Sequence, residues 1–122
     1  MSSSHDLGRR GEALAAATLA RRGWTILERN FRLGRNEIDI VARRGVVVAF
    51  IEVKTRAGLG HGHPLEAITR AKRREIERVA RAWLERHGRP GDVYRFDAVA
   101  ITWRRHGRPV VEHVPDAWRV ER

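Results

Sequence analysis

The spacing of apolar residues changes several times along the chain and predicts two helices. Residues 2–23 form an Ala-rich segment in which Gly23 is placed as a helix stop. The stretch Leu65–Gly88 is amphipathic, with apolar residues recurring at about 100° per residue on one stripe. The members of this stripe are Leu65, Ile68, Ile76, Val79 and Trp83. Gly88 and Pro90 are expected to end the second helix.

Five shorter segments are β-branched, aromatic or alternating in polarity, as is typical of strands. They are Trp24–Phe31, Glu37–Ala42, Val46–Lys54, Asp92–Trp103 and Val110–Val114. The residues after Val114 are expected to form a polar tail. The resulting order α-β-β-β-α-β-β, without a repeat or a long linker, predicts a single domain over residues 1–122. Its sheet is flanked by helices, in the α/β or α+β class.

The third predicted strand begins apolar and ends in Glu-x-Lys, with Glu52 and Lys54 on one face. It is expected to pair with the preceding strand as a hairpin, in which Ile38 and Ile40 share one face. A two-residue loop of Arg44 and Gly45 would place Asp39 opposite Phe50 and Glu37 opposite Glu52. Asp39, Glu52 and Lys54 then share a face, with Asp39 diagonal to Glu52.

Two carboxylates and a lysine at the end of a core strand have two explanations. Neighbouring carboxylates repel each other, and a divalent cation such as Mg²⁺ relieves the repulsion through oxygen ligands. Such an ion can polarise a phosphodiester, while Lys54 orients the attacking water or stabilises the developing charge. The alternative is an exposed strand end carrying an ordinary Glu–Lys pair.

The charge of the chain favours a polyanionic partner. The 122 residues carry 25 basic and 15 acidic side chains, a formal net charge of +10, which points to nucleic acid. The alternative explanation is codon bias in a GC-rich genome, which raises the number of arginines. Only two of the basic residues are lysines, Lys54 and Lys72. Lysine is a compact charge that can give up a proton, unlike arginine, so both are candidates for positions that arginine cannot fill.

The remaining composition bears on location. Without cysteine the chain has neither a disulfide nor a thiolate metal site, which fits a reducing cytoplasm. Glu12 interrupts the one stretch that resembles a signal peptide, so we interpret it as a helix. No stretch approaches the roughly 18 apolar residues of a membrane span, and we expect a cytoplasmic protein that does not enter the membrane.

Four segments in order resemble a known family: "GEALAAATLARRGWTILERNFR", "NEIDIVA", "FIEVKTR" and "RFDAVAI". They are similar to the YraN-like uncharacterised bacterial family, which resembles Holliday junction resolvases of the PD-(D/E)xK nuclease superfamily. The resemblance implies a restriction-endonuclease-like α/β core with a mixed central sheet and a Mg²⁺-type nuclease site. Asp39 matches the first acid of the motif, Glu52 and Lys54 its (D/E)xK, and Glu12 the acid that some members carry on the first helix. Ile38 replaces the proline of the motif, and Asn36 stands where glycine is expected.

Several residues are candidates for supporting roles. Glu12, in an otherwise apolar segment, is a candidate metal ligand, or else compensates the helix dipole. Lys72 falls on the apolar stripe and is expected to reach the Asp39 and Glu52 site or the scissile phosphate. Glu37 is a second acid beside Asp39 or an ordinary strand-start charge. Asp97 is expected to be structural and paired with an arginine.

The other candidates concern ligands and partners. The candidate nucleic-acid contacts are Arg56, Arg70 and Arg74. Arg70 and Arg74 belong to the solvent face of the second helix, which either binds along a phosphate backbone or is only solvated. His61 and His63 lie in a Gly-rich loop without further ligands, which disfavours zinc. Trp118 in the polar tail is a candidate exposed contact for a homodimer.

The prediction is therefore a Mg²⁺- or Mn²⁺-dependent endonuclease acting on DNA, with structured or branched DNA as the expected substrate. Asp39 and Glu52 would hold the metal and Lys54 would position water, assisted by Glu12 and Lys72. Two alternatives remain: a non-catalytic nucleic-acid-binding module of the same fold, and a protein whose basic surface binds another polypeptide.

Overall fold

A computed structural model describes residues 4–58 and 62–120 of the chain. It contains two α-helices, one short 3₁₀ helix and five strands in a single sheet. The helices are α1 (Ser4–Arg21), η1 (Pro64–Ala67) and α2 (Arg70–His87). The strands are β1 (Thr25–Leu33), β2 (Asn36–Arg44), β3 (Val47–Ala57), β4 (Val93–Trp103) and β5 (Val110–Trp118).

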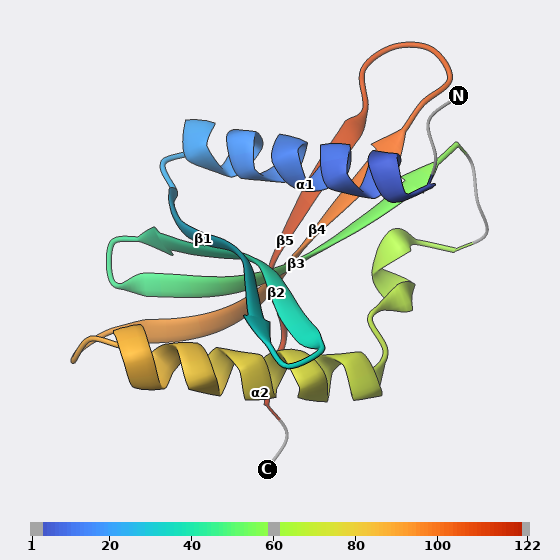
Figure 1. Cartoon of the computed structure of the whole chain (residues 1–122). Coiled ribbons are helices and arrows are strands. Elements are labelled where there is room, and N and C mark those ends of the chain that lie inside the picture. The colour runs from blue at the N-terminus through green and yellow to red at the C-terminus, as the bar shows by residue number, and fades with distance from the viewer. Residues whose placement is uncertain (1–3, 59–61, 121–122) are drawn as a thin grey trace.

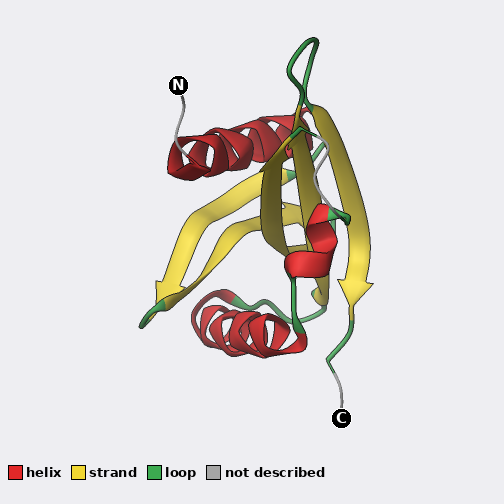
Figure 2. Ribbon diagram, turned by 90° about the vertical axis from the view of Figure 1, so that its right-hand side faces the viewer, coloured by secondary structure: helices red, strands yellow, loops and turns green. Residues whose placement is uncertain are grey.

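The five strands lie in the order β1-β2-β3-β4-β5, and the sheet is mixed. β3 and β4 are parallel, and every other neighbouring pair is antiparallel. The connection between the parallel strands contains α2, as such a crossover requires. α1 and α2 lie on opposite sides of the sheet (Figures 1 and 2). The predicted α/β class and the order α-β-β-β-α-β-β are confirmed. No helix in the described part of the chain is long and apolar enough to cross a membrane.

Gly23 ends α1 as predicted. Gly23 has φ +94°, its N–H donates to Ala20, and the N–H of Trp24 reaches back to the carbonyl of Leu19. This pair of bonds is the Schellman arrangement, in which a glycine takes the left-handed conformation that other residues avoid. Leu19 and Trp24 are both buried in the cluster between α1 and the sheet, so the helix end also fixes the docking of α1.

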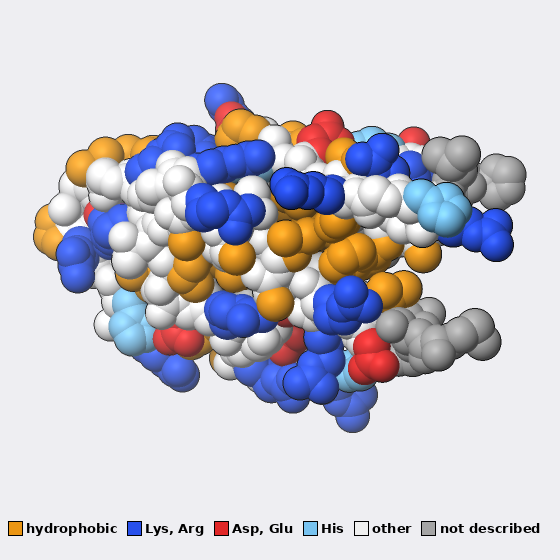
Figure 3. Space-filling view, turned by 90° about the horizontal axis from the view of Figure 1, so that it is seen from above, with side chains coloured by type: hydrophobic (Ala, Val, Ile, Leu, Met, Phe, Trp, Pro, Cys, Tyr) orange, Lys and Arg blue, Asp and Glu red, His pale blue; other side chains and the backbone are white. Residues whose placement is uncertain are grey.

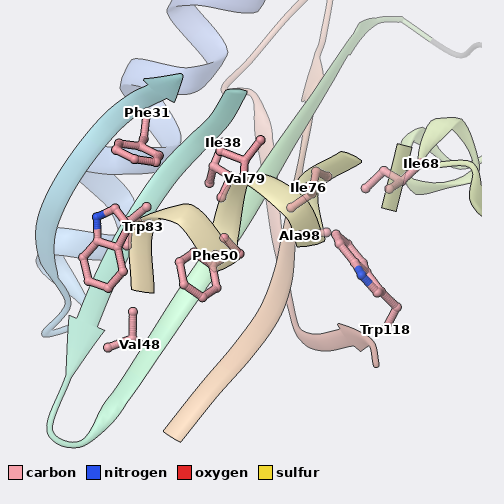
Figure 4. Packing of buried hydrophobic residues seen from close by; sticks show 12 residues of the cluster. Phe31, Ile38, Val48, Phe50, Ile68, Ile76, Val79, Trp83, Ala98 and Trp118 are labelled. Carbon is pink, nitrogen blue, oxygen red and sulfur yellow. The ribbon is translucent and has the colours of Figure 1, made fainter. Parts of the chain in front are cut away.

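α2 is shorter than the predicted helix. It begins at Arg70, where the Thr69 side chain caps it by accepting the N–H of Lys72. Leu65 lies instead in η1, which begins at Pro64. Ile76, Val79 and Trp83 still face the sheet, and Figure 4 shows them packed over Val48 and Phe50 of β3, among other residues. The sequence therefore predicted the apolar stripe of α2. It did not predict that Thr69 caps this helix or that Pro64 begins a separate 3₁₀ helix.

β5 continues past the predicted strand end. The register between β4 and β5 is irregular between Phe96 and Ala98, and Asp116 takes a positive φ of 52°. Pro115 and Asp116 thus form a bulge within the strand rather than the start of a tail. Trp118 beyond the bulge is only 7% exposed and stacks on Phe96. The expectation that Trp118 is an exposed dimer contact is wrong, because the bulge returns it to the core.

The hairpin of β2 and β3 differs in register from the prediction. Arg44 pairs with Val47, so the loop is Gly45 and Val46. This displacement of the loop by one residue shifts the pairing by two, which leaves the side chains of the paired residues 40–44 and 47–51 on their predicted faces. Continuing the register beyond Ile40 and Ile51 places Asp39 opposite Glu52, not opposite Phe50.

One predicted face is wrong at the start of β2. Ile40 belongs to the core under α1, but Ile38 belongs to the core under α2. The pairing of β2 with β3 ends at Ile40. Beyond this point β2 is held by β1 alone and lies toward α2, so the simple alternation fails there (Figure 1).

Candidate functional site

β2 and β3 separate into a fork, and the fork defines the candidate site. The last pair between them is Ile40 with Ile51. β3 then continues beside β4 as far as Ala57, while the start of β2 follows β1 in another direction (Figure 1). Asp39 and Glu52 are the first residues past the last pair. A fork of this kind opens a cleft at the centre of the sheet without breaking the core on either side.

The two acids at the fork are buried. Asp39 is 8% exposed and Glu52 is 4% exposed. Asp39 Oδ2 accepts the backbone N–H of Val53 at 2.8 Å, a donor located just where β2 no longer pairs with β3. Glu52 Oε2 is buried and has no hydrogen-bond partner. An unpartnered carboxylate oxygen in the interior is costly, so this atom is available to bind a ligand.

Burial and mutual repulsion shift the titration of both acids. Burial, followed by the nearby charge of Glu52, raises the pKa of Asp39 to about 8 from an ordinary 3.8. The charges of Glu12 and Glu37 act in the same direction, and the Val53 hydrogen bond opposes them. Burial also raises the pKa of Glu52, although Lys54 and Lys72 partly offset it. In the metal-free protein the pair therefore retains a proton near neutral pH, and a cation would have to displace it.

Both lysines lie near Glu52. Lys54 Nζ is 3.4 Å from Glu52 Oε1, and its side chain is 28% exposed, so the ammonium group reaches both the acid and solvent. Lys72 is half-buried, lies 3.9 Å from Glu75, and is close enough to Glu52 to lower the pKa of that carboxyl. Lys72 is therefore close enough to act on Glu52, although it does not line the cleft and its ion pair is with Glu75 of its own helix.

A cleft of about 390 Å³ opens over the fork. Asp39, Glu52 and Lys54 line it from the strands, and Glu12 lines it from α1. Glu12 has a partner that the sequence did not reveal: Asn30 of β1 donates its amide to Glu12 Oε1 at 2.7 Å. The structure therefore brings together four of the five predicted catalytic residues around one cleft.

The donors of this cleft fit a hard divalent cation. Asp39 and Glu52 offer carboxylate oxygens, which Mg²⁺ and Mn²⁺ prefer, and the orphaned Glu52 Oε2 is available to bind. Among residues 4–58 and 62–120, no three His, Asp or Glu side chains are grouped as metal ligands. Mg²⁺ commonly uses one or two carboxylates, with waters and substrate phosphate completing its shell, so the pair is sufficient.

The predicted arginine contacts divide between two places. Arg56 lines the cleft and donates to the carbonyl of Gly62. Arg70 and Arg74 do not line it; they border a separate small cavity of about 90 Å³ beside Trp118. Of the two loop histidines, His61 lies outside the described residues. His63 contacts Glu112 at 2.6 Å and caps η1, which gives it a structural role.

Asp97 is structural, as predicted. Arg95 contacts both of its oxygens at 2.8 Å, and His113 and the N–H of Asp116 complete the set. Burial alone would raise the pKa of Asp97, but these hydrogen bonds outweigh it and lower the pKa. The buried acids of β2 and β4 thus have opposite environments. Asp97 has every donor it needs, whereas Asp39 faces other acids. Glu37 pairs with Arg32 at 3.1 Å.

Two further positions shape the cleft and were not predicted. Asn30 takes a positive φ of 53° within β1, a conformation that asparagine tolerates better than most residues. Gly11 packs against β3 so tightly that a Cβ there would lie 2.2 Å from Thr55 Oγ1. Gly11 therefore sets how closely α1, and with it Glu12, approaches the fork. In the sequence these positions are only an asparagine in a predicted strand and a glycine in a predicted helix. Neither pattern is specific enough to predict a role at the cleft.

Comparison with known proteins places the chain in a family. Residues 11–101 match the model of the uncharacterised protein family UPF0102. The chain belongs to this family. A UPF0102 protein of Clavibacter michiganensis subsp. michiganensis is 47% identical over 96% of this chain and 99% of its own. Relatives from Chlorobium phaeobacteroides and Geobacter sulfurreducens are 43% identical (98% of each chain covered) and 46% identical (93% of this chain, 89% of theirs).

The UPF0102 match confirms the family predicted from the sequence and encloses the site. It begins at Gly11, which touches Thr55, and includes Glu12 and the fork. It ends at Ile101 in β4, before β5. The cleft is thus formed largely by the part of the chain that the family shares.

Proposed function

We propose that this UPF0102 protein is a Mg²⁺- or Mn²⁺-dependent endonuclease that hydrolyses phosphodiester bonds in DNA. The observation that carries the proposal is the buried Asp39 and Glu52 pair at the fork, with Glu52 Oε2 unpartnered. A fold gains nothing from two buried acids that repel each other and leave one carboxylate oxygen unpartnered. A site that binds a cation explains them.

Each residue has a distinct part in the proposed chemistry. Asp39 and Glu52 hold the cation, which when bound supplies Lewis-acid stabilisation of the phosphate. Lys54, beside Glu52 and open to solvent, orients the attacking water and stabilises the charge that develops on phosphate oxygens. Glu12 holds its place through Asn30 and contributes negative charge at the rim. Lys72 moderates the charge of Glu52 from the other side.

The substrate follows from charge and from the resemblance to resolvases. The formal net charge of +10 favours a polyanion, and Arg56 reaches the same cleft as the acids. The PD-(D/E)xK resemblance, carried by Asp39, Glu52 and Lys54, points to branched or otherwise structured DNA. The chain would then act as a DNA-binding hydrolase, and a homodimer remains part of the proposal through the resemblance alone.

A cleavage assay tests the proposal. Mg²⁺ and Mn²⁺ are titrated into the wild type and Glu52→Ala with a labelled four-way junction, plain duplex and single strand. Glu85→Ala, on the exposed outer surface of α2, is the matched control. We expect metal-dependent cleavage by the wild type and Glu85→Ala, and none by Glu52→Ala. Tight DNA binding without cleavage by any of the three, at saturating metal, would replace the nuclease with a binding module.

A further inference from the structure

A second hollow adjoins the cleft on the side of α1 and β1. It has a volume of about 750 Å³, the size range of ligand-binding sites. We call it the α1–β1 groove. Its basic side chains come from both elements: Arg9 and Arg10 from α1, and Arg29 and Arg32 from β1. Figure 3 views the molecule from the side of α1 and shows basic side chains along this face.

The acids of the α1–β1 groove are already engaged. Glu12 accepts from Asn30, and Glu37 pairs with Arg32 at 3.1 Å. Arg10 lies over the ring of Trp103. Arg9 and Arg29, both exposed, make no ion pair with any residue in the described ranges. The groove therefore presents unneutralised positive charge toward solvent, which suits a phosphate backbone rather than a neutral ligand.

Glu12 connects the groove to the site. It lines the cleft and the α1–β1 groove alike, so the two hollows meet at this side chain. Asn30, which holds Glu12, lines the groove and takes a positive φ. Strained non-glycine residues are concentrated at functional sites. A chain that leaves the cleft past Glu12 enters the groove directly.

Other basic regions are less suited to the same role. The cavity bordered by Arg70 and Arg74 has only about 90 Å³. Arg78 and Arg81 lie on the exposed side of α2, a helix that covers the sheet face opposite α1. Neither region shares a residue with the cleft.

We infer that the α1–β1 groove binds the phosphodiester backbone of the DNA strand where it continues out of the cleft, with Arg9 and Arg29 contacting phosphates. The inference rests on the proposed function and adds the direction in which the substrate runs. It assigns a contact surface to β1 and α1, whereas the sequence pointed to Arg56 of β3 and to Arg70 and Arg74 of α2.

The test is the salt dependence of DNA binding, measured by fluorescence anisotropy without added metal so that no cleavage occurs. Each phosphate contact contributes about 0.9 to the slope of log K against log salt for duplex DNA. Arg9→Ala/Arg29→Ala is compared with Arg78→Ala/Arg81→Ala, which removes the same charge from α2. We expect the first pair to reduce the slope by about 1.8 and the second to leave it nearly unchanged. Thermal unfolding should be unaltered in both, because all four side chains are exposed.

An unchanged slope in Arg9→Ala/Arg29→Ala would overturn the inference, as would an equal reduction in both pairs. Failure of the nuclease proposal has a different signature, because the slope is measured without chemistry. A changed slope with no cleavage under any metal would retain the groove and remove the enzyme. Cleavage with an unchanged slope would retain the enzyme and remove the groove.

Discussion

Asp39→Asn should stabilise the metal-free protein near neutral pH, although it removes a proposed metal ligand. Asparagine has the shape of a protonated aspartic acid. Its amide oxygen can accept the Val53 N–H, and its NH₂ group can donate to Glu52 as the protonated carboxyl does. The substitution therefore keeps the contacts of the protonated form and removes the ability to ionise.

The size of the effect follows from the pKa of Asp39. Its carboxyl titrates at about 8 in the folded protein and near 3.8 when unfolded. Between these values the folded state binds one more proton, so the stability contributed by the protonated form is full below the unfolded pKa and declines as pH rises through the folded pKa. The decline is about 1.4 kcal/mol per pH unit. The advantage of Asp39→Asn should thus grow by about 3 kcal/mol from about pH 5 to about pH 7.

Urea unfolding at these two pH values, with chelator present, measures this difference. Asp97→Asn is the control, because Asp97 is also buried but its pKa is lowered by its hydrogen bonds. That substitution should destabilise the protein by about 3–5 kcal/mol at neutral pH, because it breaks a buried ion pair with Arg95. If the free energies of unfolding of the wild type and Asp39→Asn change by the same amount between the two pH values, the raised pKa of Asp39 is refuted. The shared proton at the fork is then refuted with it.

Three further outcomes are expected. Gly11→Ala should lower the free energy of unfolding by about 1–3 kcal/mol, because the new Cβ meets Thr55 Oγ1. In a Thr55→Ala background the same substitution should be neutral or stabilising. Urea unfolding of the double-mutant cycle measures the coupling between the two positions, and its absence would contradict the close approach. The affinity for Mn²⁺, measured by calorimetry, should fall about tenfold per pH unit below about 8, since the proton of Asp39 must leave; a pH-independent affinity would count against the site. Trp118→Ala should cost about 3–5 kcal/mol in thermal or urea unfolding, whereas a loss below about 0.5 kcal/mol would indicate an exposed side chain.

Much of the sheet could be predicted from the sequence, because alternation is robust to small errors. The hairpin loop was misplaced by one residue, yet the two-residue shift in pairing kept the paired residues 40–44 and 47–51 on their predicted faces. In β2, alternation fails at Ile38, where the strand loses its partner β3 and turns toward the other core. The fork forms because β2 and β3 diverge in space beyond Ile40 and Ile51. The alternation of polar and apolar residues within one strand carries no information about the direction of its neighbour.

The ends of elements were harder to predict for a similar reason. Pro115 and Asp116 suggested a strand end, but a bulge carried β5 onward, and Asp116 was held by Asp97 of the neighbouring strand. The end of β5 is therefore set by contacts with the neighbouring strand β4 rather than by the residue types at positions 115 and 116. The same holds for Asn30 and Glu12, 18 positions apart in the chain. The acids of the site could be recognised from their types and spacing, whereas the residue that positions Glu12 could not.

Manganese occupancy at the fork is the most direct test of the central claim, that Asp39 and Glu52 form a cation site. Mn²⁺ is titrated into the wild type, Glu52→Gln and the exposed control Glu85→Ala, and free ion is followed by electron paramagnetic resonance. We predict bound Mn²⁺ in the wild type and in Glu85→Ala, and its loss in Glu52→Gln, which removes the negative charge and one of the two carboxylate oxygens. No bound Mn²⁺ in the wild type, or equal binding by Glu52→Gln, would contradict the account.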